Sequence, residues 1–257
     1  MGFPHAIPLD RTNSDYLMNR RIFEIKYAGH TIRYAFQYPA TRWRFRNYLQ
    51  PSNAEEYDIL ATPERIEAIR SAMPEGSANA YVEYRSLIDL TSLVLLQYNC
   101  CILHAVSFLW RGYAWLLTAP SGTGKTTQYN NWRRLFPGEI TMISGDMPAL
   151  EARDDGSVWV HPSSWNGKEN LSSGLSAPLG GLVLLEQGRE NRIAPLSPAE
   201  GVAPVFKQFM ALPETEEEIL LMTQLEDRLL RAAPAWKLVN LGDDASTRLL
   251  RRTLEQS

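Results

Sequence analysis

A run of small, polar and basic residues in the middle of the chain has the composition of a phosphate-binding loop. It comprises Ser121, Gly122, Thr123, Gly124, Lys125, Thr126 and Thr127. Consecutive backbone N–H groups in such a loop converge on phosphate oxygens, and the N-terminus of a following helix adds favourable dipole charge. In this motif the lysine reaches the β- and γ-phosphates, and the threonine after it binds Mg²⁺. These roles predict phosphate binding by Lys125 and metal binding by Thr126.

The segments around the loop fit this interpretation. The apolar run Tyr113–Thr118 precedes it, and 125–136 has a helical pattern that ends at Pro137-Gly138. A surface loop with an exposed lysine would need neither element. Ala119 stands where the motif has its first glycine, so the loop is expected to turn there without positive φ, which alanine disfavours.

Two further polar residues could take part in chemistry at this loop. Asp146 follows the apolar segment Ile140–Ile143, and a carboxylate there could bind Mg²⁺ or accept a proton from a phosphoryl acceptor. The alternative is a turn residue before Pro148. His104 lies in the strand expected to pair with the one that leads into the loop. It could therefore tune the pKa of Asp146, or it could equally be a structural histidine.

A polar loop at 162–170 is the candidate for substrate contacts. It contains Trp165, Lys168 and Asn170, a mixture that suits binding of a polar or anionic group. Lys168 could neutralise charge that spreads over the phosphoryl oxygens in the transition state. A solvated loop whose tryptophan packs locally is the alternative, and composition alone favours it.

Composition limits the other classes of function. A chain of 257 residues with 44% hydrophobic and 21% charged residues has an ordinary globular balance. The net charge of −3 argues against nucleic-acid binding. No apolar run approaches the roughly 18 residues of a membrane span, and the first residues lack the organisation of a secretory signal. We therefore expect a cytoplasmic protein without membrane partners, whose adjacent Cys100 and Cys101 are buried, reduced thiols.

The pattern along the chain predicts a small α+β unit at residues 1–78 and a larger α/β domain at 79–257. Alternation in 21–27 and 31–38 predicts a hairpin, and Thr62–Ala72 has the signals of a short helix. Strand and helix patterns alternate after Cys100, and an early hairpin before the phosphate loop implies a mixed sheet. Further strands are expected at 157–160, 182–185 and 236–240, and further helices at 198–211, 215–232 and 245–254.

Three motifs, taken in order, resemble a known family. Leu103–Ala105, Ala119–Thr127 and Ile143–Asp146 are similar to motifs in the C-terminal kinase domain of HPr kinase/phosphorylase. That P-loop fold is related to the nucleotide-binding core of ATP-dependent phosphoenolpyruvate carboxykinase, whose loop also reads Ser-Gly-Thr-Gly-Lys-Thr-Thr. The stretch Pro162–Leu185 is similar to a narrower subgroup of small HPr-kinase-like proteins associated with peptide-modification gene clusters. The resemblance extends over residues 85–256.

The resemblance implies ATP and Mg²⁺ as ligands. Residues 121–127 would bind the nucleotide phosphates, and Thr126 would bind the metal. Asp146 would activate the acceptor hydroxyl or bind the metal, with His104 as its neighbour. The bifunctional enzymes have two consecutive aspartates where this chain has Gly145-Asp146, which argues against phosphorylase activity. Residues 1–78 do not resemble their N-terminal domain, which argues against HPr as the substrate. The family includes ring-shaped hexamers, so a homo-oligomer is left open.

Together these features predict a kinase that transfers phosphate from ATP to a serine or threonine hydroxyl on a peptide or small protein. Residues 1–78 would then recognise that substrate. One alternative is a small-molecule kinase, acting for example on free serine. Another is a catalytically silent nucleotide-binding regulator, which Ala119 and the missing second aspartate keep open. An open strand edge would favour a peptide substrate, whereas a closed pocket would favour a metabolite.

Overall fold

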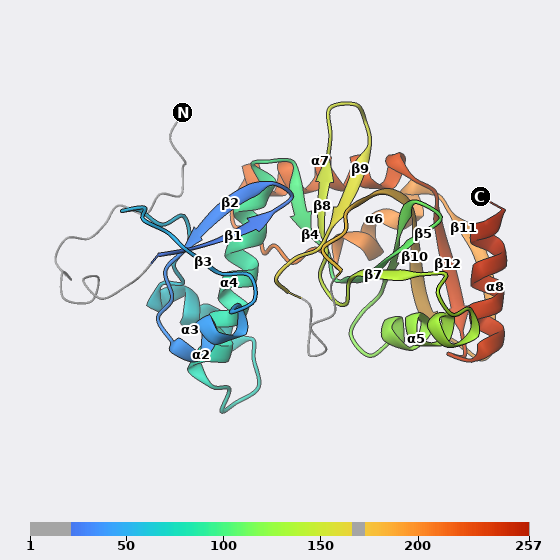
Figure 1. Cartoon of the computed structure of the whole chain (residues 1–257), viewed down its shortest axis with the longest axis horizontal. Helices are drawn as coiled ribbons and strands as arrows, with labels where there is room; N and C mark the ends of the chain where they lie inside the picture. Colours follow the sequence, from blue (N-terminus) through green and yellow to red (C-terminus); the bar gives the residue numbers. More distant parts are fainter. Residues whose placement is uncertain (1–21, 166–172, 257) are drawn as a thin grey trace. The chain divides into compact units, whose positions relative to one another are not determined.

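The computed structural model describes residues 22–165 and 173–256. The chain forms two compact units, which we call unit 1 (Met1–Thr91) and unit 2 (Ser92–Ser257), as Figure 1 shows. The division falls inside helix α4 (Asn79–Leu96), later in the chain than the boundary at residue 78 that the sequence indicates. The role of residues 1–78 in substrate recognition stays a prediction.

Unit 1 combines a small antiparallel sheet with helices. The predicted hairpin is present, and Ala28 (φ 49°) and Gly29 (φ 86°) have the positive φ angles that a two-residue hairpin turn needs. The sheet order is β2-β1-β3. Before α4, its elements are β1 (Phe23–Tyr27), β2 (His30–Tyr34), α2 (Pro39–Arg44), β3 (Gln50–Pro51) and α3 (Pro63–Ser71).

Unit 2 is a mixed α/β structure, as the sequence predicts. Its strands are β4 (Cys100–Ile102), β5 (Ala105–Trp110), β6 (Tyr113–Thr118), β7 (Thr141–Ser144), β8 (Ala149–Ala152), β9 (Val158–His161), β10 (Ala177–Gln187), β11 (Arg192–Leu196) and β12 (Ala235–Asn240). Its helices after α4 are α5 (Lys125–Leu135), α6 (Pro198–Phe206), α7 (Glu216–Ala232) and α8 (Asp244–Glu255).

The centre of the sheet has the strand order β7-β5-β6-β10-β12-β11. β5 pairs with both β6 and β7 in antiparallel fashion, whereas β10 is parallel to its two neighbours, β6 and β12. The first residues of β10 instead pair with β9, which continues the sheet to β8 and β4. The carboxyl ends of β6, β10 and β12 therefore share one edge, which is where ligands bind in open α/β sheets.

Helices cover both faces of this sheet. One face packs against α5 and α8, and its core includes Trp132 from α5, Leu250 from α8 and the aromatic strand residues Phe108 and Trp110. The rings of Phe108 and Trp132 lie 5.3 Å apart, within the range of favourable aromatic pairs. The other face packs against α6 and α7 through leucine, valine and methionine side chains. The core thus lies on both sides of β6.

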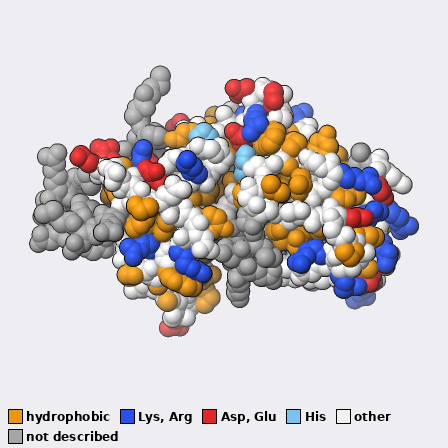
Figure 2. Space-filling model, viewed as in Figure 1, with side chains coloured by type: hydrophobic (Ala, Val, Ile, Leu, Met, Phe, Trp, Pro, Cys, Tyr) orange, Lys and Arg blue, Asp and Glu red, His pale blue; other side chains and the backbone are white. Residues whose placement is uncertain are grey.

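The charged surface over α5 and α8 is basic, and two of its arginines have ion-pair partners. Figure 2 shows Lys and Arg side chains gathered over these helices. Arg134 pairs with Asp244, and Arg251 pairs with Glu139 at 2.9 Å. Such pairs contribute little to stability when they are exposed. No helix in the described part of the chain is long and apolar enough to cross a membrane.

In unit 2, β8 and β11 form where the sequence patterns predict no strand. β8 begins directly after Pro148, and it pairs with the short strand β4 as well as with β9. β11 contains Pro195 and pairs only with β12, at an edge where the missing N–H of proline is tolerated.

Cys100 and Cys101 are buried free thiols, and burial raises the pKa of Cys100 to about 12.

One buried acid on α7 makes the stability of unit 2 depend on pH. Glu226 is 1% exposed, and its Oε1 has no hydrogen-bond partner among the described residues. Burial raises its pKa from 4.5 to about 7, so between these values the native state binds more protons than the unfolded state. Stability therefore falls as pH rises through this window.

We expect the free energy of unfolding to fall by about 2 kcal/mol between pH 5 and pH 8 because of Glu226. The Glu226→Gln variant should lose this dependence and be more stable than wild type at pH 8. Urea denaturation at the two pH values measures both effects. Glu217→Gln, at an exposed position of the same helix, is the matched control and should behave as wild type. An unchanged slope in Glu226→Gln would show that another group is responsible.

Candidate functional site

Lys125, the first residue of α5 after the loop, is a buried charged residue. It is 7% exposed, and its Nζ donates to the carbonyl of Ala119 at 2.8 Å and to that of Pro120 at 3.4 Å. Burial lowers the pKa of Lys125, and the nearby carboxylate of Asp146 acts in the opposite direction. The ammonium is thus held at the loop by carbonyl oxygens, in a place that disfavours its charge unless acceptors or anions surround it.

His104 lies between Lys125 and Asp146. Its Nε2 is 3.2 Å from Lys125 Nζ and 3.5 Å from Asp146 Oδ1. Nε2 cannot accept a hydrogen bond from Lys125 and donate one to Asp146 at the same time. A neutral ring with the proton on Nδ1 therefore accepts from Lys125, whereas a ring with a proton on Nε2, neutral or cationic, donates to Asp146. The structure brings together the three residues that the sequence predicts as catalytic, and their roles stay predictions.

The sheet explains why these side chains meet. Ala105 at the start of β5 pairs with Thr118 at the end of β6, so His104 lies beside the beginning of the loop. The Thr118 hydroxyl donates to the His104 carbonyl at 2.9 Å. The N–H of Ala105 donates to the Asp146 carbonyl at 2.8 Å, which fixes the turn after β7 beside β5. Three strand ends thus position the lysine, the histidine and the aspartate.

The loop itself is formed by residues 119–124, and α5 begins at Lys125. Gly122 (φ 81°) and Gly124 (φ 109°) are left-handed, which glycine tolerates. Ala119 is not among the left-handed residues of the described chain and is fully buried in the core. The expectation that the loop turns without positive φ there is therefore confirmed. Its side chain packs where a glycine would leave space.

The surface of the loop leaves polar groups open to solvent. Ser121, Gly122, Thr126 and Thr127 are exposed, and Thr123 and Gly124 are partly exposed. The side chain of Asp146 is 30% exposed. Within residues 22–165 and 173–256, no group of three His, Cys, Asp or Glu side chains could hold a metal. A hydroxyl and one carboxylate nevertheless fit Mg²⁺, which commonly binds to one or two carboxylates together with phosphate oxygens.

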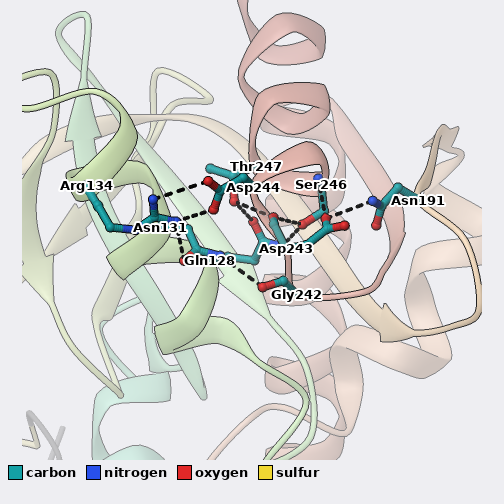
Figure 3. A network of polar contacts seen from close by, with 9 residues as sticks. All are labelled: Gln128, Asn131, Arg134, Asn191, Gly242, Asp243, Asp244, Ser246 and Thr247. Carbon is teal, nitrogen blue, oxygen red and sulfur yellow. Dashed lines mark hydrogen bonds and ion pairs between the residues drawn. The ribbon is translucent and has the colours of Figure 1, made fainter.

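Polar contacts join α5 to the segment that leads into α8, and Figure 3 shows Gln128 with Ser246 and Thr247 among them. Gln128 is fully buried, and its Nε2 donates to Asn240 Oδ1 at 3.2 Å and to Ser246 Oγ at 2.6 Å. Its Oε1 accepts from the Thr247 hydroxyl at 2.8 Å. These bonds join the helix that carries Lys125 to the end of β12 and the start of α8. Because the partners are more than 100 residues away in sequence, no local pattern predicts this role for Gln128.

The predicted substrate loop begins next to Asp146. The Ser163 hydroxyl donates to the carbonyl of Met147, and the N–H of Trp165 donates to Ser163 Oγ at 3.0 Å. Trp165 is fully buried, which indicates packing, and its contact with substrate stays a prediction. Lys168 and Asn170 lie outside the described residues.

Comparisons with known proteins leave the family open. No family model matches the chain, and no curated protein matches it. Among solved structures, the chain is similar to the Hpr(Ser) kinase/phosphatase from Coxiella burnetii, with a TM-score of 0.32 and 9% sequence identity. That match covers 60% of this chain and 93% of the other chain. At such similarity it assigns no function, so the proposal below rests on the residues.

We expect Gln128→Leu to lower the free energy of unfolding by about 2 kcal/mol, because it leaves several buried polar groups without their partner. Urea denaturation measures the loss. The matched control is Asn130→Leu, at an exposed position of the same helix, which should change stability by no more than about 0.5 kcal/mol. Equal effects of the two substitutions would contradict a role for Gln128 in anchoring α5.

Proposed function

We propose that unit 2 is an ATP- and Mg²⁺-dependent kinase of the HPr-kinase type that phosphorylates a serine or threonine hydroxyl on a peptide or small protein. The observation that carries the proposal is the row formed by Lys125, His104 and Asp146 beside a glycine-rich loop. A base, a cation and a loop of backbone donors at one sheet edge are the parts that phosphoryl transfer needs.

Each residue has a role that follows from its place. The N–H groups of residues 121–126 and the Lys125 ammonium would hold the β- and γ-phosphates. Thr126 would hold Mg²⁺, which when bound neutralises phosphate charge. The ammonium of Lys125 now contacts neutral carbonyl oxygens, so phosphate oxygens would give it a stronger, charge-assisted partner.

The transfer step uses Asp146 as the base. The oxygen of the acceptor hydroxyl bonds to the γ-phosphorus, and the bond from that phosphorus to the bridging oxygen of ADP breaks. The hydroxyl proton moves to the Asp146 carboxylate, and His104 lies 3.5 Å away to stabilise the carboxylate when its ring is protonated. One carboxylate suffices for this direction of the reaction.

The two alternatives to this function make different predictions. A metabolite kinase would transfer phosphate to free serine but not to peptides. A silent regulator would bind ATP without transfer to any acceptor. The peptide proposal therefore requires transfer from labelled ATP to a pool of serine- and threonine-containing peptides.

We expect Asp146→Asn to lower the rate of phosphoryl transfer at least about 100-fold, because the amide cannot accept the hydroxyl proton. The rate is measured with radiolabelled ATP and the peptide pool, after a binding titration has shown that ATP still binds. Asp154→Asn makes the same chemical change at an exposed turn and should keep the wild-type rate. Transfer by Asp146→Asn at an undiminished rate would exclude Asp146 as the base.

A further inference from the structure

A cavity of about 450 Å³ lies beside the loop in unit 2. This volume is within the range of small-molecule sites. The cavity is formed by the loop, the end of β10 and the end of α6, and its lining residues include Pro120, Thr123, Leu184, Gln187, Ala203 and Gln208. Apart from the backbone of Thr123, none of the groups given a role above lines this cavity.

The walls combine apolar surface with a few polar groups. Leu184, Leu185, Ala203 and Pro204 supply the apolar part. Gln208 is 6% exposed, and its side-chain amide carries both a donor and an acceptor. Glu186 and Lys207 add two charged side chains at the walls of the cavity. An apolar slot with polar and charged groups at its walls suits a flat heteroaromatic ring that carries polar edges.

The order of the strands places the cavity away from the reacting end of a bound triphosphate. Asp146 follows β7, and the cavity lies at the end of β10, three strand spacings away along β7-β5-β6-β10. With about 4.8 Å between neighbouring strands, the two strand ends are separated by roughly 14 Å. A nucleotide has its γ-phosphate at one end and its nucleoside at the other, so it would extend from Asp146 toward β10.

The loop and the end of β10 are also joined directly. Gln187 Nε2 donates to the carbonyl of Gly122 at 3.2 Å. Pro120 and Thr123 contribute to the cavity wall, while neighbouring loop residues carry the exposed groups described above. A ligand held by the loop would therefore have the cavity within reach of its other end.

We propose that this cavity binds the nucleoside, base and ribose, of the nucleotide whose phosphates the loop holds. The inference rests on the proposed function. The rival occupant is a side chain of the acceptor, since the carbonyl of Gln208 accepts from the N–H of His104 at 2.8 Å. The acceptor is disfavoured because its hydroxyl must reach Asp146, which lies toward β7 and away from the cavity.

Protection of an introduced thiol tests the position of the nucleoside. The native cysteines are buried, so a maleimide should label the Ala203→Cys variant at the new thiol, which lines the cavity. Val202→Cys is the matched control, because Val202 is 44% exposed on the same helix and is not part of the lining. Labelling rates are measured without ligand, with Mg-ATP, and with magnesium tripolyphosphate, which has phosphates but no nucleoside.

With ATP at ten times its Kd, we expect labelling of Ala203→Cys to slow about tenfold, since only about a tenth of the protein remains free. Tripolyphosphate should leave that rate unchanged, and Val202→Cys should react equally in all three conditions. If both ligands bind but ATP gives no protection, the nucleoside lies elsewhere and the inference is wrong, while the proposed function stands. If neither ligand binds the wild-type protein, the proposed function itself fails, and the inference with it.

Discussion

The position of every group at the candidate site depends on the pairing of β6 with strands of opposite direction on its two sides. β5 is antiparallel to β6, so the start of β5 lies opposite Thr118 at the end of β6. β10 is parallel to β6, so Leu184 near its carboxyl end lies opposite the same residue. The loop that leaves β6 is therefore flanked by His104 on one side and by Gln187 on the other.

Burial of the Lys125 ammonium costs free energy, and hydrogen-bond acceptors in the site offset that cost. Lys125 is buried, and an ammonium in such a place needs acceptors. The carbonyls of Ala119 and Pro120 and the ring of His104 supply them. The lysine is consequently held close to the position where a phosphate would meet it, and little rearrangement of the loop is needed for binding. Gln128 contributes by fixing α5, from which Lys125 extends.

The parts of this site that could be predicted from sequence are those encoded locally. The residues of the loop, the helix at Lys125 and the hairpin before the loop have short-range signals of composition and periodicity. The proximity of His104 and Asp146 followed from the pairing expected of neighbouring strands. Composition could not predict the burial of Trp165. A polar loop is compatible with a tryptophan that is open to substrate and with one that is fully buried, as Trp165 is.

Other features could not be predicted because they depend on partners far away in sequence. Gln128 and Gln208 look like ordinary polar residues until the fold brings them against Ser246 and His104. β11 has a proline and no clear alternation, and it forms because the edge of β12 offers a partner. The spacing of Met222, Leu229 and Leu230 places Glu226 on the apolar face of α7, but its nearly complete burial depends on how that helix packs.

The central claim is that the loop and Lys125 bind the phosphates of ATP, and isothermal titration with Mg-ATP tests it most directly. The account predicts one binding site on the full chain. It also predicts that Lys125→Met weakens binding at least about tenfold, equivalent to 1.4 kcal/mol. Lys26→Met, which removes one exposed positive charge from unit 1, should leave the affinity unchanged. Equal affinity of wild type and Lys125→Met, or no binding of ATP by the wild-type chain, would contradict the account.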